Sequence, residues 1–139
     1  GPVTTWAHVS AGELISFRSS LALKIARDVL TDRGLDTPNK VADPFNDAVN
    51  IGLSKPESVF SKLSAASEAE TYLGYVIGAD LAAFRAYWLG QDIVILGIED
   101  EAHWIYAALK SQFAMVRRDT QDYLGRGAHA VRAHVLGET

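Results

Sequence analysis

Apolar residues recur three or four positions apart along much of this chain, as they do on one face of a helix. The first such stretch follows Ser10 and Glu13, which have the spacing of a capping box. Its apolar positions are Leu14, Phe17, Leu21, Ile25 and Val29. Gly34 comes next, and glycine is the residue that most often ends a helix in a left-handed conformation. The pattern predicts a helix over residues 11–33.

Two shorter helices are expected between residues 35 and 67, where Pro, Asn, Asp and Ser are frequent. Asp43 precedes Pro44, and Pro56 precedes Glu57; proline and acidic residues are both favoured in the first turn of a helix. Apolar residues follow at helical spacing in each case, namely Phe45, Val49 and Ile51, and then Val59, Phe60 and Leu63. We therefore predict two short helices in this part of the chain.

The strongest helical patterns lie in the second half of the chain. Ser67 and Glu70 have the capping-box spacing again, which predicts a helix over residues 68–89 that ends at Gly90. Another helix is expected over residues 92–124, because its apolar residues fall on one stripe. They are Ile95, Ile98, Ala102, Ile105, Leu109, Phe113, Val116, Thr120 and Tyr123.

Two segments of this half allow other interpretations. The apolar run over residues 93–96 is also compatible with a short buried strand, although the sequence offers no evident partner strand. A last short helix is expected over residues 128–135, after two glycines.

These elements predict an all-α fold. We expect a bundle of three long helices and two or three short ones, in which the two longest helices, 68–89 and 92–124, form an antiparallel hairpin. The chain has 139 residues, about the usual size of one domain, and we expect a single soluble domain over residues 3–139. The first two residues are typical of what a cleaved expression tag leaves behind.

The charge balance indicates which classes of partner this protein can bind. The chain has 17 acidic and 13 basic residues and a formal net charge of −4. No overall positive field draws in a phosphate backbone, so we expect no nucleic acid partner.

The most apolar region, residues 71–98, contains the charged residues Asp80, Arg85 and Asp92, so no membrane span is expected. The absence of cysteine excludes disulfides and thiolate metal sites. It leaves the compartment open, and we take the cytoplasm as the default.

Small residues repeat every four positions in the predicted helix 68–89. They are Gly74, Gly78, Ala82 and Ala86. Glycine in the middle of a helix costs about 1 kcal/mol relative to alanine, so a close approach by another helix is expected there. That helix can belong to the same chain, to a second copy or to a partner protein; a flat ligand is the remaining alternative. With Trp88 and Trp104 nearby, we predict that these residues form an interface.

One group of polar residues predicts a metal or ligand site. Glu99 and His103 lie four residues apart, and Asp100 and His103 three apart, so they share one helix face. In the expected antiparallel hairpin, Asp80 lies at the same height. A divalent metal is one interpretation; a solvated acidic patch is the other, with Asp80 paired to an arginine such as Arg18 or Arg85.

The sequence contains no evident catalytic motif; for example, no serine lies in a Gly-x-Ser-x-Gly turn. No cofactor is expected either. The favoured function is therefore a non-enzymatic helical interaction module of the regulatory or adaptor type. We expect it to homodimerise or to bind a protein partner through the apolar helical hairpin over residues 71–106. The alternative is a small metal- or ligand-binding protein, or an enzyme, that uses Asp80, Glu99, Asp100 and His103.

Overall fold

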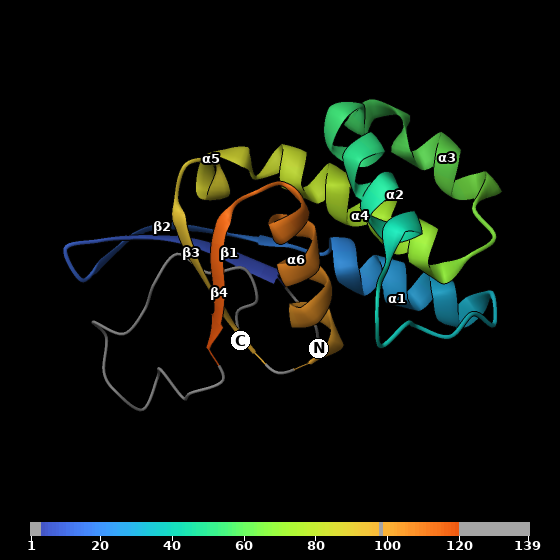
Figure 1. Ribbon diagram of the computed structural model, residues 1–139, viewed down its shortest axis with the longest axis horizontal. Coiled ribbons are helices and arrows are strands. Elements are labelled where there is room, and N and C mark those ends of the chain that lie inside the picture. The colour runs from blue at the N-terminus through green and yellow to red at the C-terminus, as the bar shows by residue number, and fades with distance from the viewer. Residues whose placement is uncertain (1–3, 98, 120–139) are drawn as a thin grey trace.

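The computed structural model describes residues 4–97 and 99–119, and its fold contains both helices and strands (Figure 1). The all-α prediction is therefore wrong, as is the predicted helical bundle with its long antiparallel hairpin. In chain order the elements are β1 (Thr4–Ser10), β2 (Glu13–Ser20), α1 (Ala22–Asp32), α2 (Asp43–Ser54), the 3-10 turn η1 (Pro56–Ser58), α3 (Val59–Ala65), α4 (Ala69–Ala83), α5 (Arg85–Trp88), β3 (Asp92–Leu96), α6 (Asp100–Ser111) and β4 (Met115–Asp119).

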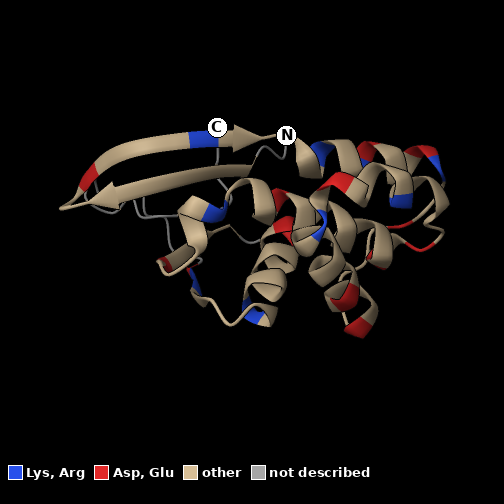
Figure 2. Cartoon of the chain, turned by 90° about the horizontal axis from the view of Figure 1, so that it is seen from above, with Lys and Arg blue, Asp and Glu red and all other residues tan. Residues whose placement is uncertain are grey.

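The first half of the predicted helix 11–33 is instead the turn and the second strand of an antiparallel β-hairpin, and only the second half is helical, as α1. Ala11 and Gly12 both have positive φ, at 53° and 79°, which suits the tight turn that joins two strands. Ser10 pairs with Glu13 across this turn and does not cap a helix. The hairpin extends away from the helices (Figures 1 and 2). Trp6 of β1 is buried in the core, whereas the apolar side chains of β2 are more than half exposed. Their spacing therefore carried no information about burial.

The middle of the chain matches the predictions from the sequence. The two short helices are present as α2 and as η1 with α3, and each has its expected proline in the first turn. The predicted helix 68–89 is present as α4 and α5, which are interrupted at Phe84. Helices α1 to α4 lie together on one side of the two sheets, whereas α5 lies next to the strands (Figure 1).

The predicted helix 92–124 is wrong, because the chain folds there as strand, helix and strand. β3 and β4 pair in parallel, and α6 connects them. The alternative of a buried strand over residues 93–96 is confirmed, and its partner is β4, which the helical stripe had included. Gly97 and Phe113, with φ values of 140° and 60°, lie in the two connections. Thr120, Tyr123 and the predicted helix 128–135 lie outside the described residues.

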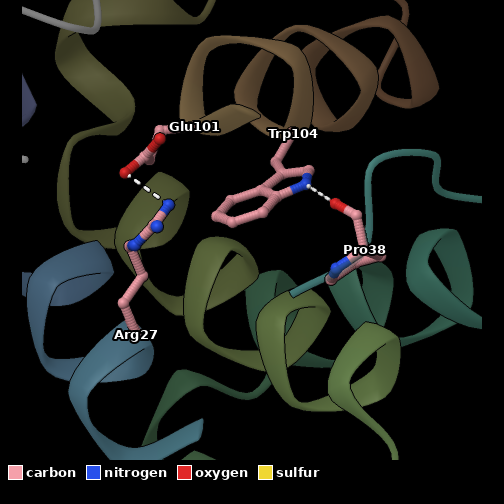
Figure 3. A network of polar contacts seen from close by, with 4 residues as sticks. All are labelled: Arg27, Pro38, Glu101 and Trp104. Atoms are coloured by element: carbon pink, nitrogen blue, oxygen red, sulfur yellow. Dashed lines mark hydrogen bonds and ion pairs between the residues drawn. The ribbon is translucent and has the colours of Figure 1, made fainter. Parts of the chain in front are cut away.

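A polar network joins α1 to α6 inside the helical part (Figure 3). The Nη1 of Arg27 donates to Oε2 of Glu101 at 2.8 Å, and the Arg27 guanidinium lies 5.8 Å from the centre of the Trp104 ring. The Nε1 of Trp104 donates to the carbonyl oxygen of Pro38 at 2.9 Å. Both Glu101 and Trp104 are buried, so the network holds α1, α6 and the loop before α2 together.

Helix α4 lies at the centre of the helical part. The view of Figure 1 shows α1 on one side of it and α2 and α3 on the other. Among the helices of residues 4–97 and 99–119, none has the length and apolar character that crossing a bilayer requires.

Candidate functional site

A groove of about 470 Å³ lies along α4, between α1 and the η1–α3 segment. Its floor is one face of α4, since positions 72, 76, 79 and 83 follow one another at helical spacing. Apolar residues of α1 and α3 form the two walls. Those used below are Ile25, Val29, Val59 and Phe60. A concave and mostly apolar surface of this volume is typical of a binding site.

The groove has exposed apolar side chains on both borders. Ile25 of α1 is 55% exposed and Phe60 of α3 is 85% exposed. Both line the groove while most of their surface remains in water. Exposed aromatic and aliphatic side chains beside an apolar groove are typical of an interaction surface.

One end of the groove contains the carboxylate of Asp80. The hydroxyl of Ser20 donates to its Oδ1 at 2.7 Å, and Ser20 in turn accepts a hydrogen bond from the backbone N–H of Ala22 at 3.2 Å. These contacts join the end of β2, the start of α1 and the last turn of α4. Arg18 and Arg85, the expected partners, are exposed, and within the described ranges neither forms an ion pair with Asp80.

Burial raises the pKa of Asp80 to about 6 from an ordinary value of 3.8, although the hydrogen bond from Ser20 and the proximity of the Trp6 indole N–H lower it. At neutral pH the carboxylate is therefore ionised in a poorly solvated place without a cation beside it. A perturbed carboxyl group in a groove is a typical feature of a functional site.

Asp80→Asn should stabilise the fold at pH 7.5 by about 2 kcal/mol, because each unit of pKa shift corresponds to about 1.4 kcal/mol. Since the folded-state pKa is raised, the stability due to the bound proton is full below pH 4 and is lost as the pH rises through about 6. The gain should therefore disappear at pH 4. Urea unfolding at both pH values measures it. The exposed Asp28→Asn should show no such pH-dependent gain, and an equal gain at pH 4 and 7.5 would contradict the assignment.

The opposite end of the groove contains Arg33. Its Nη1 donates to the carbonyl oxygens of Leu63 at 3.2 Å and Ala66 at 3.1 Å, and its guanidinium lies 5.4 Å from the centre of the Tyr72 ring. These contacts attach the end of α1 to α3 and α4. The groove thus has a carboxylate at one end and a guanidinium at the other.

The four residues predicted to hold a metal or ligand do not gather at one place. Asp80 lies in the groove, whereas Glu99, Asp100 and His103 lie at the start of α6, where the two acidic residues are exposed. In the described part of the chain, no group of three or more His, Asp or Glu side chains is arranged to hold a metal ion. The expected alignment required two adjacent helices, but β3 lies between α5 and α6 in the chain.

The small residues of the predicted interface face α2 of the same chain. A Cβ on Gly74 would lie 2.5 Å from the carbonyl oxygen of Phe45, and one on Gly78 would lie 2.3 Å from that of Val49. Close approach by a helix is thus present, and the helix is internal.

The remaining residues of that predicted interface have different environments. Trp88 and Trp104 are buried, and each indole N–H donates to a backbone carbonyl, that of Leu81 and that of Pro38 respectively. Ala82 is half-buried, and Ala86 is exposed. Interaction of this set with a second chain stays a prediction.

Sequence reasoning missed the role of three groove residues: Ile25, Arg33 and Phe60. Ile25 and Phe60 were placed correctly on helices, but their spacing resembles that of the core positions. The exposure of Phe60 follows only from the packing of α3 on α4. The sequence predicts Arg33 only as the last residue of the helix, and no local signal shows that its side chain reaches α3.

Comparison with known proteins adds no further information, because no family model, curated protein or solved structure matches this chain.

Proposed function

We propose that this protein is a non-enzymatic interaction module whose groove binds an amphipathic helix of a protein partner. The observation that carries the proposal is the apolar groove between α1, α3 and α4 with exposed apolar side chains on both borders. Amphipathic helices bind such grooves by inserting apolar side chains that recur at each turn. The α4 floor belongs to the 71–106 region expected from the sequence, whereas both walls lie outside it.

The dimensions of the groove suit a helix of about three turns. The α4 floor extends from Tyr72 to Ala83, which corresponds to about 16 Å at 1.5 Å per residue. A small molecule inside the groove would leave most of Ile25 and Phe60 in water. A helix that lies across both borders buries them, and the burial of one such side chain contributes about 2 kcal/mol.

A displayed library of 16-residue helices tests this function. The library carries Leu, Ile or Phe at four positions of one face and Lys, Glu, Ser or Ala at the flanking positions. Helices enriched on the wild-type protein should bind Phe60→Ser at least about tenfold more weakly, because a buried aromatic anchor contributes more than 1.4 kcal/mol to such interfaces. Fluorescence anisotropy with the synthetic peptides measures the difference.

Phe113→Ser is the matched control, because Phe113 is 93% exposed and does not line the groove. Its affinity for the same peptides should stay within twofold of the wild-type value. The proposal is abandoned if no helix is enriched, or if the two serine variants bind the enriched helices equally well.

A further inference from the structure

The charges of the groove identify one feature of its partner, and this inference rests on the proposed function above. Asp80 is near the first turn of α1, as its hydrogen bond to Ser20 shows, and Arg33 is at the other end of that helix. On α4, Asp80 marks one end of the groove, and Tyr72, which contacts Arg33, marks the other. These two residues are about 12 Å apart at a rise of 1.5 Å per residue. Arg33 is therefore too far away to neutralise Asp80.

The Asp80 carboxylate has neutral donors only. The Ser20 hydroxyl occupies Oδ1, and the Trp6 Nε1–H nearby makes no hydrogen bond of normal geometry. Within residues 4–97 and 99–119, Lys24 pairs with Asp28 and Arg27 with Glu101, and neither ion pair involves Asp80. Asp80 is half-buried, and a partly desolvated carboxylate without a cationic partner costs free energy that falls when a cation reaches it.

The surroundings of Asp80 make the groove the direction from which a cation can arrive. Asp80 lines the groove together with Ala22 and Ala83, whose small side chains leave space at that end. The other floor residues next to Asp80, Val76 and Ala79, have apolar side chains that cannot bind a cation. A long basic side chain can lay its methylene groups along this floor and place its charge at the carboxylate.

We propose that the partner helix carries a lysine or arginine that forms a charge-assisted hydrogen bond with Asp80 in the groove. The basic residue lies on the edge of the apolar face of that helix, since its neighbours contact Ile25 and Phe60. Hydrogen bonds between ionised groups are roughly twice as strong as neutral ones. The groove thereby selects among amphipathic helices, which otherwise share the same apolar pattern.

A double-mutant cycle tests this contact. An enriched helix that contains a basic residue is synthesised with lysine and with norleucine at that position, and both peptides are measured against the wild-type protein and Asp80→Asn. The change from lysine to norleucine should weaken binding to the wild type at least tenfold and binding to Asp80→Asn less than twofold. Enrichment on Asp80→Asn should in turn yield helices without a basic residue at this position.

The outcomes separate the two proposals. Equal losses on both proteins, or enriched helices that lack a basic residue, would overturn the contact with Asp80, while the groove function would survive if binding still required Phe60. If no helix is enriched at all, both proposals fail. Asp28→Asn, which changes an exposed carboxylate of α1 outside the groove, should retain the full effect of norleucine.

Discussion

Gly78→Ala is expected to destabilise the fold by about 3 kcal/mol, the upper range for forcing extra atoms into a packed interior. The new Cβ would lie 2.3 Å from the carbonyl oxygen of Val49 and 2.8 Å from the backbone nitrogen of Leu53, so one of the two helices must move. Helix propensity alone predicts the opposite sign, a gain of about 1 kcal/mol. Urea unfolding of both proteins decides between these effects.

Gly90→Ala provides the comparison for this experiment. Gly90 has a φ of 72° and nothing within 4 Å of an added Cβ, so alanine there adds only backbone strain, on the order of 1 kcal/mol. If Gly78→Ala were as stable as the wild type, α2 and α4 could not be in direct backbone contact.

Arg27→Met is expected to cost about 3 kcal/mol, because it leaves the Glu101 carboxylate buried without its cation. The Glu101 side chain is 7% exposed, so water cannot take the place of the guanidinium. Methionine keeps much of the aliphatic stem, and the loss therefore reports mainly on the charge. The free energy of unfolding in urea, measured at pH 7, gives the value.

Lys24→Met on the same helix is the control, since Lys24 and Asp28 form an ion pair that is exposed on both sides. Its loss should stay below about 0.5 kcal/mol, as is usual for surface pairs. The double variant Arg27→Met with Glu101→Met should recover most of the stability, because apolar replacements of a buried pair are often neutral. A loss in Arg27→Met no greater than that in Lys24→Met would show that the pair does not contribute.

The carboxylates of Glu101, which is buried, and Asp80, which is half-buried, make an instructive contrast. Glu101 has an internal arginine at 2.8 Å, and its charge is compensated within the fold. Asp80 has the Ser20 hydroxyl at a similar distance, which is a neutral donor. The first carboxylate is explained by stability alone, whereas the second has a charge that the described fold leaves uncompensated. This difference is why Asp80, and not Glu101, is placed in a binding role.

The sequence by itself determined the elements whose signals are local. Proline favours the start of α2 and of η1, and glycine favours the end of α1. Both effects depend only on the few residues next to them in the chain. Gly34 indeed has a φ of 72°, and the N–H of Leu35 returns to the carbonyl of Leu30. The two glycines in the middle of α4 also predict the close approach of another helix, because glycine there is costly without a compensating backbone contact.

Only the tertiary structure decided between helix and strand in segments where the spacing of apolar residues is compatible with both. β3 needs a parallel partner, and that partner is β4, about twenty residues away, brought beside it by α6. The β-hairpin could not be predicted because the apolar residues of β2 stay exposed, so their spacing does not indicate which side of the segment is buried. The groove also depends on the tertiary structure, because Ser20 and Asp80 are 60 residues apart in the chain and meet only when α1 packs on α4. Contacts between residues distant in the chain depend on how whole elements pack, and no local spacing carries that information.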